Sequence, residues 1–456
     1  MKKKITYLPV LLALLASGCG ALTGSSYERP NVQTPAMWSV VQGAGQEKAS
    51  SWWTKFNDKN LNSLVDEVLA KNNNLAVAAL KVKEARLRAD LALDQYLPDV
   101  TGTATARNAR KLSKAGTVTR TYTASVNASY EIDLWGKIAS QKDSADWEAE
   151  ATEQDRETAA IALIGTTADL YWKIAYLNER IALSEASIAY AKKALDIAKV
   201  QHAAGATSAI DEAAAEQKLA TQEAAHTQYL QQRQEAMNAF DILFDGPPGS
   251  LKAEAAVLPK GEMPRLDANV PASLLERRPD LRAAEYRLRE SLADTDATRA
   301  SYMPTFSLTG SLGTSSIALT KVLVDPIGTL GAGIALPFLN WFDMRNNIAV
   351  SETQYEEAVT TFRQTVYSAF ADVENALSAR AKDGERGRKL KVALANAQKA
   401  EDLYGVQYKE GYVPLQTLLD AQESRRVAEA AVLENITTQL GDCIALYKAL
   451  GGDTKR

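Results

Sequence analysis

The stretch RASYMPTFSLTGSLG, residues 299–313, changes its hydrophobic period at one proline. Upstream of it, from about residue 280, apolar side chains recur every three or four residues, which predicts an amphipathic helix. After Pro304, apolar or glycine positions alternate strictly with threonine and serine, which predicts a β-strand with one apolar and one polar face. The stretch DQYLPDVTGTATA, residues 94–106, makes the same change. The fold therefore contains the same helix-to-strand transition twice.

These two transitions belong to a tandem duplication with a period of 206 residues. The identical pairs at this spacing include Tyr96 and Tyr302, Pro98 and Pro304, Trp135 and Trp341, Gln201 and Gln407, Gly205 and Gly411, and Glu84 and Glu290. Chance does not produce agreement at one constant spacing over more than a hundred positions, so internal repetition sets the domain organisation. We expect a first repeat at residues 19–243, an inter-repeat linker at 244–271 and a second repeat at 272–456.

Each repeat predicts the same order of elements: a helix, two strands, a very long helix, a glycine-centred turn and a return helix. The predicted ranges are 61–95, 100–109, 121–132, 140–202 and 208–243 in the first repeat, and 272–301, 305–312, 329–338, 346–408 and 415–450 in the second. The helix expected at 272–301 should be interrupted at Arg278-Pro279, because the sequence RRPD suits the start of a helix.

The long helices carry heptads. In the first of them, apolar and small residues step by threes and fours through residues 167–198, as in a coiled coil. Sixty helical residues span roughly 90 Å, so such a helix has no globular core to wrap and must pack against copies of itself. A free-standing coiled-coil spacer is the alternative.

The N-terminus is a targeting segment. Lys2, Lys3 and Lys4 precede an apolar run too short to cross a bilayer, and LLASGCG then resembles a bacterial lipobox. Residues 1–18 would be a lipoprotein signal peptide, and Cys19 would be the lipidated residue. Gly20 after the cysteine implies sorting to the outer membrane. The alternative is an ordinary cleaved signal with an incidental cysteine.

Composition excludes several classes of function. The formal net charge of −4, without a basic stripe, argues against nucleic acid. The two histidines, His202 and His226, have no nucleophile arranged beside them, so we expect no enzyme, no metal site and no cofactor other than the lipid on Cys19. Cys443 lies on a helical pattern, and we expect it to be a small residue packed in the interior.

The strands indicate a membrane barrel shared between chains. Their lengths suit a tilted bilayer crossing, and apolar and polar residues alternate as in a water-filled barrel, although one wet face of a soluble sandwich alternates identically. The aromatic residues at or near strand ends are Tyr122, Tyr130, Trp135, Phe306, Phe338 and Trp341. Four strands cannot close, whereas two chains give eight strands and three give twelve with room for a pore. A trimer is the favoured number.

Four segments resemble the TolC-like outer-membrane factor family, in its lipoprotein subgroup of efflux exit ducts. They are WWTKFNDKNLNSLVDEVLAKNNNL at 52–75, YEIDLWGK at 130–137, LLERRPDLRAAEYRLRES at 274–291 and YKEGYVPLQTLLDAQ at 408–422. The resemblance implies a mainly α protomer with membrane β-strands, three copies of which form a twelve-stranded outer-membrane barrel continued by a long α-helical periplasmic tunnel. It also implies an equatorial band, to which residues 244–271 would contribute.

The resemblance further implies partners and site residues. The duct would dock on a periplasmic adaptor and an inner-membrane pump, commonly proton-driven and of the RND type, and pass drugs or toxic solutes outward from a Gram-negative cell. Gly205 and Gly411 would form the periplasmic tip that adaptors contact. Asp420 matches the family's gate carboxylate, with Gln416 as a second constriction one turn earlier. A solvated helix charge is the alternative for Asp420.

Two other functions stay open on the sequence. One is an outer-membrane channel for type I protein secretion, and the other is a structural lipoprotein that tethers the outer membrane without conducting. Lipidation and the efflux-type motifs favour small molecules.

Overall fold

The computed structural model describes residues 24–39, 51–112, 116–250, 257–259, 261, 263–264, 271 and 274–452. The predicted signal peptide and Cys19 lie outside the described residues. The chain forms two compact units, which we describe separately. Unit 1 takes in Met1–Val32, Leu80–Gln154 and Leu281–Thr365, and unit 2 takes in Gln33–Ala79, Asp155–Asp280 and Val366–Arg456.

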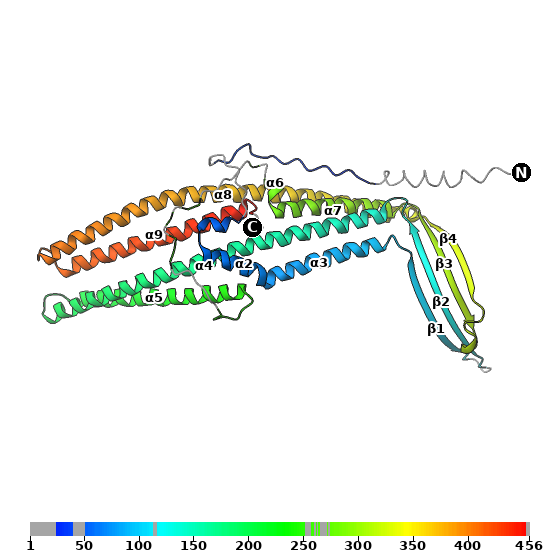
Figure 1. Cartoon of the computed structure of the whole chain (residues 1–456), viewed down its shortest axis with the longest axis horizontal. Coiled ribbons are helices and arrows are strands. Elements are labelled where there is room, and N and C mark those ends of the chain that lie inside the picture. Colours follow the sequence, from blue (N-terminus) through cyan, green and yellow to red (C-terminus); the bar gives the residue numbers. More distant parts are fainter. Residues whose placement is uncertain are drawn as a thin grey trace. The chain divides into compact units, whose positions relative to one another are not determined.

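Unit 1 contains one four-stranded antiparallel sheet in the order β1-β2-β3-β4 (Figure 1). The strands are β1 (Asp99–Arg110), β2 (Val118–Ile132), β3 (Thr305–Ser316) and β4 (Ile327–Ala335). Each repeat supplies one hairpin, and β2 of the first joins β3 of the second. Among the described residues, β1 and β4 each have a single partner strand. The sheet therefore has two open edges.

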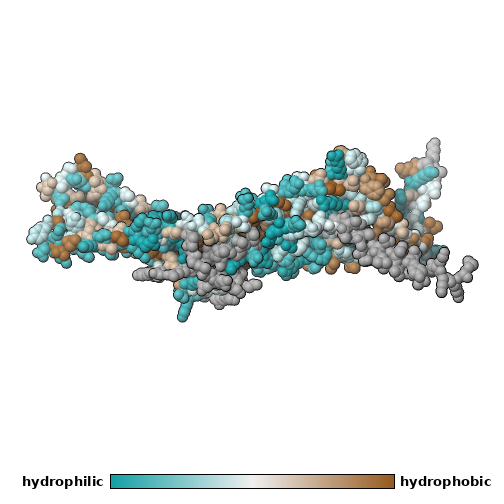
Figure 2. Space-filling view, turned by 90° about the horizontal axis from the view of Figure 1, so that it is seen from above, coloured by the Kyte–Doolittle hydropathy of each residue, from teal (hydrophilic) through white to brown (hydrophobic). Residues whose placement is uncertain are grey.

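The register gives the sheet two chemically different faces, because directly paired residues in antiparallel strands lie on the same face. On one face Tyr130 pairs with Leu308, which in turn pairs with Ala332. On the other face Thr103 pairs with Ser125, and their hydroxyl oxygens lie 2.8 Å apart. The predicted alternation is thus confirmed and continues across all four strands. Figure 2 shows exposed apolar side chains gathered on the part of unit 1 that carries the sheet.

Every strand differs from its predicted bounds, by up to four residues, and the differences at the ends of β3 and β4 have a physical reason. β3 runs to Ser316 instead of residue 312, because Thr314, Ser315 and Ser316 continue the ladder opposite β2 although they are polar. β4 ends at Ala335 instead of 338, and a 3₁₀ turn, η5 (Pro337–Leu339), follows it. Pro337 has no N–H to donate to a strand ladder, so it ends the strand.

The helix that leads into each first strand is interrupted. In the second repeat, α6 (Leu274–Arg277) stops where predicted and α7 (Pro279–Ser301) begins at the proline. In the first repeat, the single helix expected at 61–95 is wrong: α2 (Lys59–Lys71) and α3 (Asn73–Asp94) are separated at Asn72. The Asn72 side chain accepts a bond from the Leu75 N–H and donates to the Leu243 carbonyl, so it caps α3 while anchoring the chain.

Two very long helices dominate the chain. They are α4 (Lys137–Ala203) and α8 (Trp341–Lys409), of 67 and 69 residues, and both contribute to both units. Each returns through a tight turn into a 35-residue helix, α5 (Ala209–Leu243) or α9 (Leu415–Ala449) (Figure 1). The predicted seam of α4 is buried at Ile174, Leu177 and Ala191. None of the helices that the structure describes combines the length and the apolar composition needed to cross a membrane.

The core of unit 2 includes an aromatic cluster at the start of the family-like motif WWTKF. Trp52 and Trp53 of η2 (Trp52–Phe56) are each only 1% exposed. The Trp52 ring stacks on Tyr447 near the end of α9, with centroids 4.5 Å apart. Cys443 is completely buried one turn earlier, as predicted, and burial raises the pKa of its thiol to about 11. This cluster packs the C-terminal end of α9 against η2 within unit 2.

Candidate functional site: helical tips and a polar cluster on α9

The two tip turns have the same geometry. Gly205 and Gly411 have φ of +70° and +77°, the left-handed region that side chains with a Cβ disfavour. In the first turn, the Ala206 N–H donates to the Gln201 carbonyl, and in the second the Tyr412 N–H donates to the Gln407 carbonyl, each at 2.8 Å. These bonds close the last turns of α4 and α8 as Schellman caps. Open space surrounds both glycines, so the backbone angle and not packing requires them.

The return helix α5 begins with a capping box. The Ser208 side chain accepts from the Ile210 N–H, and the Asp211 carboxylate accepts from the Ser208 N–H. The equivalent start of α9 has Pro414 at the cap position and no side-chain cap bond. Tyr412 beside it is 80% exposed. The second tip therefore presents an aromatic side chain to solvent, a feature typical of contact surfaces.

Asp420 and Gln416 lie one turn apart on α9, as predicted. Both are exposed, and Gln416 Nε2 donates to Asp420 Oδ1 at 3.0 Å. The same Oδ1 accepts from the Tyr190 hydroxyl of α4 at 2.5 Å. A carboxylate that is bonded to the neighbouring helix is more than a solvated charge, because it holds α9 against α4.

Tyr190 is the buried centre of this polar cluster. It is 3% exposed and packs with Ala191, Ala194 and Leu419. Lys218 of α5 donates to the Tyr190 hydroxyl at 3.1 Å, and its ammonium lies 4.7 Å from the ring centroid. Burial, followed by the bond to Asp420, raises the Tyr190 pKa, so the phenol keeps its proton and donates a hydrogen bond to the carboxylate.

The Arg426 side chain also packs against the Tyr190 ring. Its guanidinium lies 5.2 Å from the Tyr190 ring centroid, a cation–π distance. Its side chain is 7% exposed and is paired with Glu423 at 2.9 Å. The cluster thus ties three helices together: α4 by Tyr190, α5 by Lys218 and α9 by Asp420 and Arg426. We call these four residues the tyrosine cluster.

The sequence predicted only one member of the tyrosine cluster, Asp420. The equivalent residues at a spacing of 206 are Asn396 for Tyr190, Ser424 for Lys218, Ala214 for Asp420 and Ala220 for Arg426. At each position only one repeat carries the aromatic or charged residue. The cluster therefore lies where the two repeats differ, as they do at most positions, and this difference alone does not single it out.

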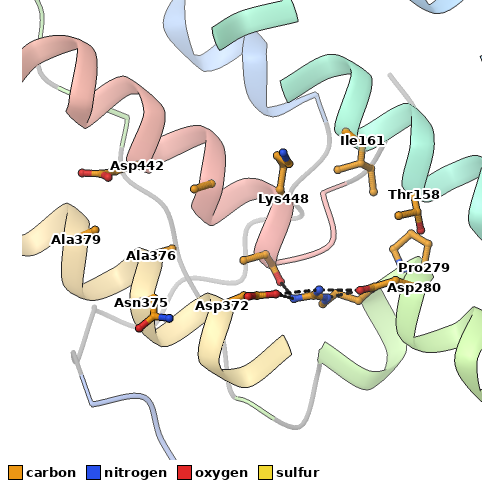
Figure 3. A pocket seen from close by; sticks show the side chains of 14 residues that line it. Thr158, Ile161, Pro279, Asp280, Asp372, Asn375, Ala376, Ala379, Asp442 and Lys448 are labelled. Atoms are coloured by element: carbon orange, nitrogen blue, oxygen red, sulfur yellow. Dashed lines mark hydrogen bonds and ion pairs between the residues drawn. The ribbon is translucent and has the colours of Figure 1, made fainter. Parts of the chain in front are cut away.

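A second polar feature, in unit 2, surrounds the start of α7. The Arg278 guanidinium donates to Asp280 at 2.7 Å, to Asp372 of α8 at 3.3 Å and to the Ala449 carbonyl at the end of α9 at 3.2 Å (Figure 3). It borders a cavity of about 510 Å³. The fourteen residues that line this cavity include neither histidine nor cysteine. Arg278 is therefore a structural joint between three helices, and this was not predicted beyond the helix start itself.

The described residues contain no group of three or more His, Cys, Asp or Glu side chains that could hold a metal ion. His226 bonds to Ser184 and His202 to Glu212, both within the α4–α5 hairpin. The arrangement can hold helices together and can present charge.

The geometry agrees with what comparison with known proteins shows. The family model described as "Outer membrane efflux protein" matches residues 64–243 and 270–452, that is, both repeats. The pyoverdine export outer membrane protein OpmQ of Pseudomonas putida is 29% identical over 464 residues, covering 99% of this chain and 98% of OpmQ. The toxin and drug export protein A of Aggregatibacter actinomycetemcomitans is 28% identical over 451 residues, with the same coverage.

Solved structures share the fold. The open state of the Neisseria gonorrhoeae MtrE outer membrane channel is 29% identical and superposes with a TM-score of 0.80, covering 95% of this chain and 98% of MtrE. The four-stranded sheet, the duplicated order of elements and the long helical hairpins are thus those of an efflux channel subunit. The chain belongs to the outer membrane efflux protein family and acts in efflux at the outer membrane of a Gram-negative cell.

Proposed function

We propose that three copies of this chain form the exit duct of a tripartite efflux pump, anchored by a lipid on Cys19. The observation that carries the proposal is the sheet with two open edges and two unlike faces. An open edge in hydrocarbon leaves N–H and C=O groups without partners, at a cost of several kcal/mol per group. Pairing β1 of one copy with β4 of the next removes both edges.

Three copies are favoured over two by the polar face. Two copies would give eight strands, a barrel whose interior side chains fill, and three give twelve. The polar face consists mainly of threonine, serine, asparagine and glycine, which are small and suit a water-filled lumen. The helices α4 and α8 would continue this lumen for about 100 Å at 1.5 Å per residue.

The periplasmic end would carry the gate and the docking surface. Three Asp420 carboxylates around a three-fold axis would repel one another and attract cations. The bond from Tyr190 would hold each α9 in place, so that opening requires this bond to break. The turns at Gly205 and Gly411, with exposed Tyr412, would contact the hairpins of a periplasmic adaptor, which joins the duct to an inner-membrane pump of the RND type.

The transported molecules would be small and toxic, and the chain would have no catalytic step of its own. The names of the relatives point to drugs, toxins and pyoverdine, which is a varied set of molecules. A wide aqueous duct discriminates only weakly between molecules of different size and charge, which fits this range of transported molecules. Selectivity would then belong to the inner-membrane pump.

The decisive experiment is electron microscopy and native mass measurement of the detergent-solubilised, full-length protein, with conductance in planar bilayers. We expect rings of three copies, a tube that extends well beyond the barrel, and ion conductance. A water-soluble single chain that ignores detergent and bilayers would refute the proposal.

Type I protein secretion is the second candidate, and the word "toxin" in the name of one relative favours it. A deletion strain separates the two. Loss of a secreted polypeptide with unchanged drug susceptibility would support secretion, whereas increased susceptibility to drugs and detergents with normal secretion supports the exit duct.

A further inference from the structure

A cavity of about 560 Å³ lies in unit 1, where α7 ends and α8 begins. Its lining residues are Gly24, Ser25, Arg299, Tyr302, Met303, Phe338, Met344 and Ile348. Most of this wall is apolar, and Met344 and Ile348 share one face of α8 because they are one turn apart. The polar groups are confined to Arg299, Ser25 and the Tyr302 hydroxyl. The volume is that of a small-molecule or single-chain lipid site.

The N-terminal segment is fixed at the cavity. The Ser25 N–H and hydroxyl both donate to the Asp296 carboxylate of α7, at 2.6 and 2.7 Å. Arg299 donates to the Ser25 hydroxyl oxygen at 3.1 Å. Because the Asp296 side chain is only 8% exposed, these bonds are shielded from water and hold firmly. The backbone at Gly24 therefore leaves for the upstream residues from the cavity wall.

The charge of the cavity selects against a phosphate. Arg299 is its only cationic lining residue, and it is paired with Asp296 at 3.1 Å and with Glu352 at 2.9 Å. Two carboxylates and one guanidinium leave no spare positive charge for an anionic headgroup. The occupant that fits is uncharged and apolar, with ester or amide groups at most at the polar end.

The chain itself brings such a group to this place. Cys19 is five residues before Gly24, so its α-carbon lies within roughly 18 Å of the Gly24 α-carbon even for a fully extended chain. The side chains beside the cavity at the start of α8, Trp341 and Phe342, are 59% and 65% exposed, as expected at a membrane interface. An acyl chain on Cys19 would find its nearest built apolar surface here.

We propose that this cavity is an acyl-chain site that receives one fatty acyl chain of the lipid on Cys19 of the same copy. The proposal rests on the predicted lipidation of Cys19 and not on the duct function. If one acyl chain sits in the protein and the others sit in the membrane, the lipid anchor would have a fixed orientation relative to α7. The N-terminal segment would then keep a fixed position along that helix.

The test uses cells fed a fatty acid that carries a photoactivatable diazirine, and then full-length purified protein. After illumination and digestion, we expect the lipidated Cys19 peptide to be joined to peptides that contain Met303, Met344 or Ile348. In Ile348→Trp, which places a bulky ring in the cavity wall and narrows the cavity, the yield should fall by at least about tenfold, equivalent to 1.4 kcal/mol. Val350→Trp adds the same ring outside the cavity lining, on an exposed position of α8, and should leave the yield unchanged.

Each other outcome overturns the proposal. If the Cys19 peptide carries no lipid, there is no acyl chain to occupy the cavity. Adducts of phospholipid mass on Met344, retained in a Cys19→Ser chain exported by an ordinary cleaved leader, would assign the cavity to membrane lipid. Joined peptides that mix isotopically light and heavy copies would assign the chain to a neighbouring copy. Equal yields in Ile348→Trp and Val350→Trp would mean that the acyl chain lies elsewhere. The conductance of Ile348→Trp and Val350→Trp should stay unchanged, so failure here is distinguishable from failure of the exit-duct proposal.

Discussion

At the scale of single residues, the proposed gate depends on the bond from the Tyr190 hydroxyl to Asp420. Tyr190→Phe removes this donor and keeps the buried ring between Lys218 and Arg426. A single hydrogen bond is worth about 1 kcal/mol net, so the open state should be favoured about fivefold per chain. We expect a higher open probability in planar-bilayer recordings.

Tyr229→Phe is the matched control for this change. The Tyr229 hydroxyl accepts from Arg180 within the α4–α5 hairpin, whereas the Tyr190 hydroxyl donates to Asp420 of α9. It should therefore leave the open probability near that of the native channel. If both variants behave alike, the loss of a phenol destabilises helices generally, and the Tyr190–Asp420 bond is not a latch.

Substitutions of Asp420 separate the effect of its charge from the effect of its hydrogen bonds. Asp420→Asn keeps an oxygen that can accept from Tyr190 and Gln416 but removes the carboxylate charge. If three such charges ring the lumen, cation preference should fall while the open probability changes little. The reversal potential under a salt gradient measures this preference, and an unchanged value in both Asp420→Asn and Asp420→Ala would remove Asp420 from the conduction path.

At the scale of elements, the packing of α7 on α4 should depend on pH. Glu290 of α7 is partly buried, and burial together with Glu148 and Asp294 raises its pKa to about 7, although Arg287 opposes this. Between pH 4.5 and 7 the folded chain holds this proton and the unfolded chain releases it. The free energy of unfolding therefore falls as the pH rises through this window and stays lower above it.

Glu290→Gln should remove that dependence. The amide resembles the protonated acid, so we expect little change in melting temperature at pH 4 and an increase at pH 8, measured by circular dichroism of the detergent-solubilised protein. Glu84→Gln is the control, because Glu84 occupies the equivalent position in the first repeat but is exposed and pairs with Arg88. A gain of equal size at both pH values would contradict the role assigned to the Glu290 carboxyl.

The elements were largely predictable because their signals are local. The change of period at Pro304 placed α7 and β3, and heptads placed α4 and α8 to within about five residues. The break at Asn72 was not predictable from periodicity, since it depends on a side chain that bonds to the distant Leu243 carbonyl. Tyr190 was missed for the same reason: its partners Lys218 and Asp420 come from two other helices.

At the scale of the whole molecule, a closed barrel predicts which face of the sheet meets water. Neighbouring β4 residues Thr329 and Leu330 point to opposite faces: Thr329 pairs with Ser311, and Leu330, 93% exposed in the single chain, pairs with Gly310. In a membrane-embedded trimer, a cysteine at 329 would line the lumen and a cysteine at 330 would face lipid. Thr329→Cys should react with a water-soluble maleimide at least about tenfold faster than Leu330→Cys, because thiolates form poorly in hydrocarbon.

The native thiols do not interfere with this measurement, since Cys443 is fully buried and the predicted lipid would block Cys19. Unfolding in denaturant supplies the control, because both engineered cysteines should then react at similar rates. The asymmetry must also vanish if assembly is prevented, since a single four-stranded sheet exposes both faces to water. Equal reaction rates in intact outer membranes would mean that the apolar face is not covered by lipid, and the strands would then belong to a soluble sandwich and not to a shared barrel.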